Sequence, residues 1–219
     1  MSRPKLLDLF CGAGGASMGY HRAGLDVIGV DIAPQPNYPF EFHQGDALDF
    51  LMRHGREFDA IHASPPCQSW TAYRRRGAGV GDGYPQLITP TRNRASLFGV
   101  PYVIENVESA REELRGPVRL CGSSFRLDVR RHRLFESNIP LSAPACDHAW
   151  QEPRFPPASN RTNLRRTVEV GVYRIPIAVQ RQAMGIDWMR LPELSEAIPP
   201  AYTEHIGRQL LAHIEERAA

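Results

Sequence analysis

The amino-acid sequence predicts an α/β fold: a Rossmann-like, doubly wound and mostly parallel sheet with helices on both faces. Apolar runs of strand length alternate with helix-length segments through the first part of the chain, and parallel strands need such crossover helices. A glycine-rich turn follows the first strand-like run, as in nucleotide-binding βα units. With 219 residues, the chain is long enough for one such domain and a small appendage.

The expected elements follow in a regular order. Residues 5–10 form an apolar run of strand length, residues 12–15 a turn, and residues 16–23 a helix that ends at Gly24. Asp31, Gly45 and two prolines end later strand-like runs. We expect further strands at 26–30, 40–43, 58–63, 101–104, 118–121 and 133–135, and further helices at 47–54, 87–98, 177–184 and 201–217.

Two regions lack a period. Residues 71–84 are rich in Gly and Arg and predict a surface loop, whereas residues 140–168 are rich in Pro, Asn and Arg and predict an extended or loosely structured insertion. Beyond residue 174 a helical pattern returns, closing the chain with a C-terminal helix.

The composition is that of a globular protein outside the membrane. The hydrophobic fraction of 42% and the charged fraction of 23% are ordinary for a soluble domain. Because no apolar run approaches the length of a membrane span and the start of the chain lacks a signal-peptide pattern, we expect a cytoplasmic protein with no membrane partner. The net charge of +2 conceals clusters of arginine, whose forked donors suit phosphates and base edges.

The four cysteines are far apart. Cys11, Cys67, Cys121 and Cys146 show no paired spacing, so the sequence suggests neither a disulfide framework nor a four-cysteine zinc site. Cys146 and His148 could supply half of a metal site, but no second pair stands at a useful spacing. We therefore expect no metal.

Three successive strand ends predict a cofactor pocket. The glycine-rich turn lets a ligand approach the backbone, Asp31 can accept hydrogen bonds from ribose hydroxyls, and Asp46 can read an adenine amino group. The alternative is that both aspartates are helix caps. Because no second phosphate-binding element follows, an adenosine ligand without phosphates fits better, and S-adenosyl-L-methionine is the commonest of these.

A thiol and a carboxylate are expected at the same edge of the sheet. Cys67 follows one strand-like run through Ser64-Pro65-Pro66, and Glu105 ends the next before Asn106-Val107. Pro65 and Pro66 restrict the backbone, and a strand end next to a helix start can lower the pKa of a thiol. A thiol that adds to a ring carbon, opposite a carboxyl that handles a ring proton, can make a pyrimidine carbon nucleophilic.

These motifs resemble those of the DNA cytosine-5 methyltransferase family, in the same order along about the first 135 residues. The resemblance implies that Cys67 is the nucleophile that adds to cytosine carbon 6, after which carbon 5 takes the methyl group. It also implies that Glu105 holds ring N3 and the exocyclic amine, that Arg133 contacts the cytosine carbonyl, and that the nearby Arg131 is a further catalytic residue. The matching segments are 8–15, Asp31, Gly45-Asp46, 65–68, 105–107 and 131–133.

The resemblance also implies a set of cofactor and nucleic-acid contacts. Phe10 is expected on the adenine, Gly12 and Gly14 against the methionine part, and Thr203 as a polar contact from the tail. The expected cofactor residues are Asp8, Phe10, Gly12, Gly14, Gly15, Asp31, Ile32, Asp46, Ala47, Pro65 and Thr203. The expected nucleic-acid residues are Gln68, Ser69, Arg74, Arg75, Arg76, Arg161 and Arg165.

Because the insertion is short, the sequence predicts the reaction more clearly than the nucleic-acid substrate. We expect a catalytic and cofactor-binding domain over 1–136, a reduced target-recognition insertion over 137–173, and C-terminal helices over 174–219. The resemblance implies a compact bacterial or phage-type enzyme that acts on duplex DNA with the target cytosine flipped out, and a partner protein that supplies specificity is compatible with so small an insertion. The alternatives are an RNA (tRNA) cytosine-5 methyltransferase and a non-catalytic cofactor- or nucleic-acid-binding relative.

Overall fold

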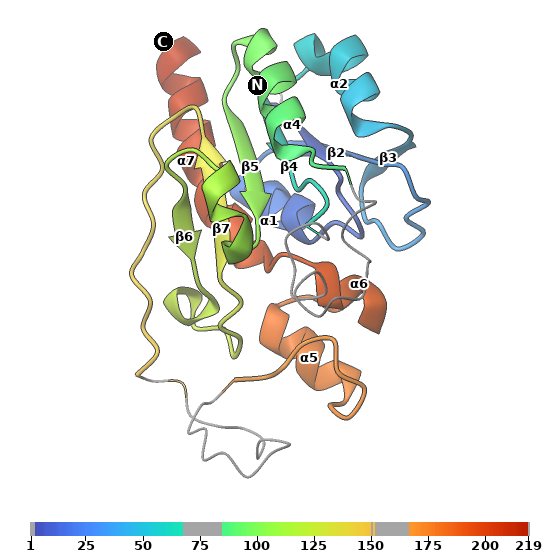
Figure 1. The fold of residues 1–219 in the computed structure, drawn as a ribbon, viewed down its shortest axis with the longest axis vertical. Helices are drawn as coiled ribbons and strands as arrows, with labels where there is room; N and C mark the ends of the chain where they lie inside the picture. Colours follow the sequence, from blue (N-terminus) through green and yellow to red (C-terminus); the bar gives the residue numbers. More distant parts are fainter. Residues whose placement is uncertain (1–2, 68–84, 150, 152–166, 219) are drawn as a thin grey trace.

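A mixed sheet organises the chain. The computed structural model describes residues 3–67, 85–149, 151 and 167–218 (Figure 1). In this part of the chain, seven strands form one sheet with the order β3-β2-β1-β4-β5-β7-β6. The strands are β1 (Lys5–Leu9), β2 (Asp26–Asp31), β3 (Glu41–Gln44), β4 (Ala60–Ala63), β5 (Tyr102–Asn106), β6 (Val118–Leu120) and β7 (Arg133–Ser137).

The direction of the strands determines where loops converge. Strands β1 to β5 pair in parallel, so their carboxyl ends share one edge of the sheet. The strand order reverses between β1 and β4, which is the crevice where ligands bind in open α/β sheets. Strand β7 is antiparallel to β5 and therefore starts at the edge where β5 ends.

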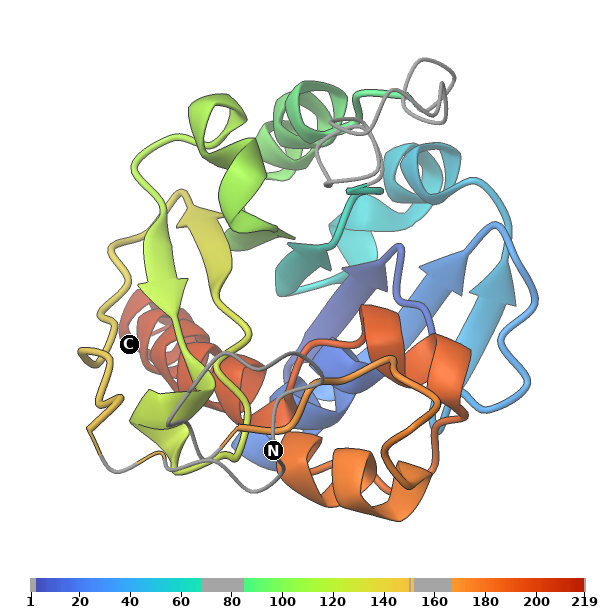
Figure 2. The same cartoon turned by 60° about the horizontal axis from the view of Figure 1, so that its bottom comes forward.

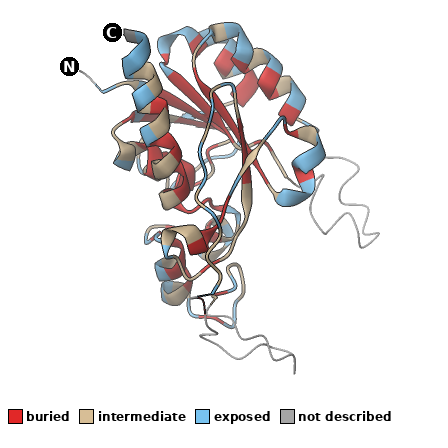
Figure 3. Cartoon of the chain, turned by 90° about the vertical axis from the view of Figure 1, so that its left-hand side faces the viewer, coloured by how far each residue is buried: buried red, intermediate tan, exposed pale blue. Residues whose placement is uncertain are grey.

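Helices cover both faces because consecutive residues of each central strand point in opposite directions. In β1, Leu6 packs in the core beneath α1 (Gly15–Ala23) and α7 (Pro200–Ala218), and Leu7 packs beneath α2 (Ala47–His54) and α4 (Ile88–Ala95). Both leucines are fully buried. Figure 3 shows the resulting layers, with buried strands between helices that are exposed on their outer sides.

A third, smaller core lies past the carboxyl ends of the strands. It contains Met184 and Met189 around α5 (Ile177–Met184) and Leu194 of α6 (Leu191–Glu196). The Trp188 indole Nε1 donates a hydrogen bond of 2.8 Å to the carbonyl of Ala13, in the glycine-rich turn. Figures 1 and 2 show α5 and α6 (orange) beyond this edge of the sheet. Together with the bond from Trp188 to Ala13, this puts them next to the turn of the predicted cofactor pocket.

The predicted element order is confirmed, with three differences. Helix α6 was not predicted, because its six residues are too few to show a helical period. The helix predicted over 87–98 is α4 followed by a 3-10 turn, η2 (Ser96–Phe98). Three more 3-10 turns were also missed: η1 (Gly55–Glu57), η3 (Glu108–Glu113) and η4 (Gly122–Phe125).

Of the two regions predicted to be irregular, the structure describes only part of the second. Residues 138–149 contain no helix or strand, and Ser142 ties them to α7 through a 2.7 Å bond from its N–H to Gln209 Oε1. The predicted loop over 71–84 and most of the rest of the insertion lie outside the described residues. None of the helices in the described part of the chain is long and apolar enough to cross a membrane.

Candidate active site

The sheet brings Cys67 and Glu105 to the same edge. Strands β4 and β5 are parallel neighbours with Ala63 paired to Ile104, so the residues that follow them emerge side by side. Glu105 is buried and Cys67 is partly buried. The thiol and the carboxyl therefore lie at the same edge of the sheet, close enough for the charge of Glu105 to act on the thiol.

Asn106 fixes the approach to Cys67. Its side-chain Nδ2 donates a 3.0 Å hydrogen bond to the carbonyl of Pro65, and its Oδ1 accepts one of 2.9 Å from the N–H of Val107. Asn106 is 1% exposed, so neither bond competes with water. The asparagine thus couples the segment that carries the thiol to the strand that carries the carboxyl.

Arg133 completes the group from the first position of β7. Its Nε lies 3.1 Å from Glu105 Oε1, and the two side chains are 16% and 8% exposed. The antiparallel direction of β7 explains this contact, because the strand begins where β5 ends. An ion pair this sheltered is weakly screened by salt, so the guanidinium is held close to the carboxyl.

Burial dominates the electrostatics of the site. It raises the pKa of the Glu105 carboxyl, while Arg133, a hydrogen bond from Ser64 and Arg131 act in the opposite direction. Burial also raises the pKa of the Cys67 thiol, as does the charge of Glu105, and Arg133 opposes them. The expected fall in the thiol pKa is therefore wrong for this structure. Protonation of Glu105 would remove one of the causes that raise the pKa of the thiol.

A buried hydrogen-bond chain behind Glu105 was not predicted. The Tyr20 hydroxyl lies 2.8 Å from His62 Nδ1, and His62 Nε2 lies 3.0 Å from Ser64 Oγ, which in turn bonds Glu105. Burial lowers the pKa of His62 to about 3, so the imidazole is neutral and one nitrogen donates while the other accepts. The chain orients the Glu105 carboxyl. A histidine within an apolar strand run was its only signal in the sequence.

Arg131 ties the tail to this edge of the sheet. Its Nε donates 2.8 Å to the carbonyl of Ala197, and an Nη donates 2.6 Å to the carbonyl of Ser195. The backbone at Arg131 is left-handed, with φ 34°, and its carbonyl accepts a 2.9 Å bond from Tyr202. These contacts favour a positioning role for Arg131 over the direct part in catalysis that the resemblance implied.

The two aspartates of the predicted cofactor pocket differ. Asp31 accepts backbone N–H bonds of 3.0 Å from Gly12 and from Ala33, one on each oxygen, and retains lone pairs for further donors. Asp46 caps α2, accepting 2.9 Å bonds from the N–H groups of Leu48 and Asp49 with one oxygen. The cap alternative thus describes Asp46 well, whereas Asp31 braces the glycine-rich turn.

Three features of the first strand ends fit an adenosine-type ligand. Apart from Gly12 and its two chain neighbours, no atom of the described residues lies within 4 Å of the position that a Cβ on Gly12 would take, so the turn leaves space there. Ile32, next to Asp31, is 71% exposed, and the Phe10 ring is partly exposed beside the core. Asp8 near the end of β1 is fully buried, and one of its carboxyl oxygens has no hydrogen-bond partner among the described residues.

Other predicted cofactor residues have packing roles. A Cβ on Gly14 would lie 2.9 Å from Pro39 Cδ, and one on Gly15 would lie 2.5 Å from the carbonyl of Ile198. Ala47 is buried as the first residue of α2. The buried Thr203 hydroxyl donates 2.8 Å to the carbonyl of Ala16, so it joins α7 to α1. The direct contact of Thr203 with the cofactor stays a prediction.

The predicted nucleic-acid contacts belong to two segments that the structure does not describe. The described residues stop at Cys67 and resume at residue 85. The predicted nucleic-acid contacts Gln68, Ser69, Arg74, Arg75, Arg76, Arg161 and Arg165 all lie outside the described residues.

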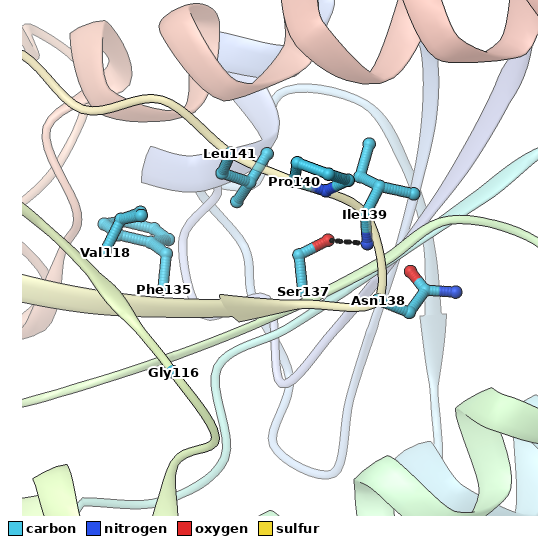
Figure 4. Close-up of a pocket in the computed structure, with 8 residues that line it drawn as sticks. All are labelled: Gly116, Val118, Phe135, Ser137, Asn138, Ile139, Pro140 and Leu141. Carbon is cyan, nitrogen blue, oxygen red and sulfur yellow. Dashed lines mark hydrogen bonds between the residues drawn. The ribbon is translucent and has the colours of Figure 1, made fainter.

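One hollow of the structure is lined by none of the site residues discussed so far. A cavity of about 420 Å³ lies between β6, β7 and the segment that follows β7, and Phe135, Ser137 and Leu141 are among its lining residues (Figure 4). None of the residues at the catalytic edge lines it. We assign the site by the convergence of reactive groups at the strand ends rather than by cavity size.

Comparison with known sequences identifies the family. The C-5 cytosine-specific DNA methylase family matches residues 4–110. The Type II methyltransferase M.HgiGI of Herpetosiphon aurantiacus is 30% identical over 122 residues, which cover 49% of this chain and 93% of that protein. The chain belongs to the C-5 cytosine-specific DNA methylase family. Cys67, Glu105 and Asn106 lie within the matched region, whereas Arg131 and Arg133 lie beyond it.

Other members of the family are longer than the matched part. The Type II methyltransferase M.XorII of Xanthomonas oryzae pv. oryzae is 33% identical over 125 residues, or 49% of this chain and 29% of the relative. The match to M.FnuDI of Fusobacterium nucleatum, at 34% identity, spans 31% of this chain and 22% of the relative. The chain thus spans less than a third of the length of these two methylases.

Solved structures agree on the fold. A putative DNA modification methyltransferase encoded within a prophage of E. coli superposes with a TM-score of 0.63 at 16% identity, covering 97% of this chain and 99% of that one. The S. pombe Dnmt2 methyltransferase gives a TM-score of 0.55 at 13% identity, with the same coverage. The predicted Rossmann-like methyltransferase fold is confirmed.

Proposed function

We propose that this protein transfers a methyl group from S-adenosyl-L-methionine to carbon 5 of cytosine in DNA, through a covalent adduct of Cys67 with a flipped-out base. The observation that carries the proposal is the meeting of Cys67, Glu105 and Arg133 at the strand ends of a family member. A thiol, a buried carboxyl and a guanidinium are the groups that this reaction requires.

The residues divide the work on the cytosine ring. The Cys67 thiolate forms a bond to carbon 6, and the electron pair of the 5,6 double bond makes carbon 5 nucleophilic. Burial raises the pKa of the Glu105 carboxyl, which favours its protonated form. The carboxyl O–H then donates to ring N3, and the other oxygen accepts a hydrogen bond from the exocyclic amine. Arg133 holds the ring carbonyl. After methylation, a base removes the carbon 5 proton, the double bond re-forms, and the thiolate leaves.

The cofactor is expected across the ends of β1 and β2. Gly12 offers open space, Asp31 accepts hydroxyl hydrogen bonds, and Phe10 and Ile32 provide apolar contact for the adenine. S-adenosyl-L-methionine supplies an electrophilic methyl group at this edge. The residues of the chain hold it beside the group that activates the base.

Binding of DNA is assigned to two arginine-containing segments of the sequence. The proposed contacts are Gln68, Ser69 and the arginines at 74–76, 161 and 165, outside the described residues, because arginines grip a phosphate backbone while a base is extruded. We retain the division into 1–136, 137–173 and 174–219, with the middle segment as a reduced target-recognition insertion. Its small size leaves room for a specificity partner. Action on bacterial or phage DNA would place the protein in the cytoplasm.

A transfer assay tests the function. The protein is incubated with methyl-labelled S-adenosyl-L-methionine and duplex DNA, single-stranded DNA or tRNA, alongside Cys67→Ala. Label in duplex DNA that disappears with Cys67→Ala supports the proposal, and bisulfite sequencing then gives the target site. Label only in tRNA contradicts the DNA assignment. Cofactor binding without label in any substrate would identify a non-catalytic relative.

A further inference from the structure

We infer that Cys121, His132, Cys146 and His148 form a binding site for one zinc ion, outside the catalytic group. Each residue offers one ligand atom, and all four atoms lie within 4.8 Å of one another. Cys121 Sγ is 3.2 Å from His148 Nε2, and Cys146 Sγ is 3.6 Å from His132 Nε2. Tetrahedral zinc with bonds of about 2.3 Å to sulfur and 2.0 Å to nitrogen separates its ligands by about 3.3 to 3.8 Å.

The ligands come from three segments that the sheet brings together. Cys121 follows β6, His132 stands one residue before β7, and Cys146 and His148 lie in the segment after β7. The antiparallel pairing of β6 with β7 places the end of one next to the start of the other. The spacing of the residues in the sequence indicated no metal site, because it shows only ligand pairs that are close along the chain. Cys121 and His132 instead come together at the paired ends of β6 and β7.

The surroundings orient the ligands as they do in known zinc sites. Glu108 Oε2 lies 3.1 Å from His132 Nδ1, which fixes the ring and leaves Nε2 toward the cysteines. Ser123 Oγ donates 3.1 Å to Cys121 Sγ and accepts 3.0 Å from the N–H of Asp147. This hydroxyl thus links the first ligand to the segment that carries the other cysteine.

The ligand set selects zinc. Two thiolates and two neutral imidazoles balance the charge of Zn²⁺ and match a structural Cys₂His₂ site, whereas Mg²⁺ and Ca²⁺ prefer oxygen ligands. Binding at neutral pH releases the two thiol protons. Without metal, the Cys121 thiol donates to the carbonyl of Arg130 at 3.2 Å, so the alternative is a group of hydrogen-bonded thiols and imidazoles.

The position of the site gives the ion a structural task. His132 stands between Arg131, which holds the tail, and Arg133, which pairs with Glu105. An ion bound to His132 would fix this turn and fasten residues 146–148 to the end of β6. Metal binding is independent of methyl transfer, so the inference and the proposed function can fail separately.

The test is the metal content of the full-length protein. After purification without added metal and dialysis, elemental analysis is expected to show about one zinc ion per chain. Replacement by Co²⁺ is expected to give the absorption bands of tetrahedral cobalt with thiolate ligands. Cys121→Ser, Cys146→Ser and His148→Gln are expected to lose the ion, whereas the matched controls Cys67→Ser and His54→Gln retain it.

Two results would overturn the inference. The first is wild-type protein that binds neither zinc nor cobalt after incubation with either ion, which would leave the hydrogen-bonded cluster. The second is a cobalt spectrum unchanged by Cys121→Ser and Cys146→Ser. If a ligand variant fails to fold, metal content and the cobalt spectrum of the wild type still decide.

Discussion

Two cysteines near the carboxyl edge of the sheet occupy opposite environments. Cys67 is partly buried, with a carboxyl and a guanidinium as neighbours that exert opposing effects on its pKa. Cys121 is fully buried, 3.2 Å from an imidazole and 3.1 Å from a serine hydroxyl. The first thiol is partly exposed beside an ion pair, whereas the second is enclosed among groups that can share a cation.

The comparison shows that neighbours, not the residue type, decide the chemistry of a thiol. Reactivity requires access and a partner that responds to the substrate. A structural metal site requires closure by four ligands with oriented neighbours. The segment 131–133 connects the two environments, because Arg133 belongs to the first and His132 to the second.

The largest effect is expected from exchanging the two thiols for inert residues. Cys67→Ala is expected to reduce methyl transfer by at least about 10⁴-fold, because the covalent bond to carbon 6 is lost with the thiol, while zinc content stays unchanged. Cys121→Ser is expected to abolish zinc binding. Activity and zinc content are measured on the same preparations. If Cys67→Ala removes the zinc, the two environments are not separate.

The buried carboxyl beneath the cofactor region gives the next effect. Burial raises the pKa of Asp8 from 3.8 to about 7. Between these values the folded protein binds more protons than the unfolded chain, so the free energy of unfolding falls as pH rises, by about 4 kcal/mol in total. Asp8→Asn is expected to remove this slope in urea titrations from pH 4 to 7, and the exposed control Asp26→Asn to keep it. An equal slope in Asp8→Asn would contradict the assignment.

Glu105 tests the catalytic side with a smaller change. Glu105→Gln keeps the size of the side chain but removes the carboxyl proton, the ion pair with Arg133 and the bond from Ser64. The expected loss in kcat/KM is about 10²-fold. The exposed Glu57→Gln serves as the matched control and should retain full activity. Comparable activity in both variants would mean that the buried carboxyl does not act on the base.

The smallest effect is expected at the metal cluster. Glu108 is half exposed and holds His132 through its Nδ1. Glu108→Gln is expected to weaken zinc binding by about 10-fold without abolishing it, the lower end for a partner of a metal ligand. Competition with a chelator measures the change, with Glu112→Gln as the control. Unchanged affinity would show that Glu108 does not orient the ring.

The sequence predicted what depends on local pattern. The strand ends, the shared edge of Cys67 and Glu105, and the turn at Gly12 follow from apolar runs and their punctuation, because parallel strands all end at one edge. The sequence left two roles for Asp46, as a helix cap or as a contact with the cofactor, since both place an acidic residue at the start of a helix.

The remainder depends on long-range packing that local pattern does not record. Thr203 bonds Ala16, which is 187 positions away, and Arg131 bonds carbonyls beyond residue 194. The hydrogen-bond chain from Tyr20 through His62 to Ser64 joins helix α1 to strand β4. Cys121 lies close to His132 because β6 pairs antiparallel with β7, and the segment after β7 brings Cys146 and His148 to the same place.

Capture of the covalent adduct tests the central claim most directly. In duplex DNA with 5-fluorocytosine in place of cytosine, no proton stands on carbon 5, so the final elimination is blocked and the bond to sulfur persists. With S-adenosyl-L-methionine present, we expect a complex that survives denaturing electrophoresis, with the modified base on Cys67 by mass spectrometry and no complex from Cys67→Ala. An adduct that survives the Cys67→Ala substitution, or none from wild-type protein that methylates ordinary DNA, would contradict the account.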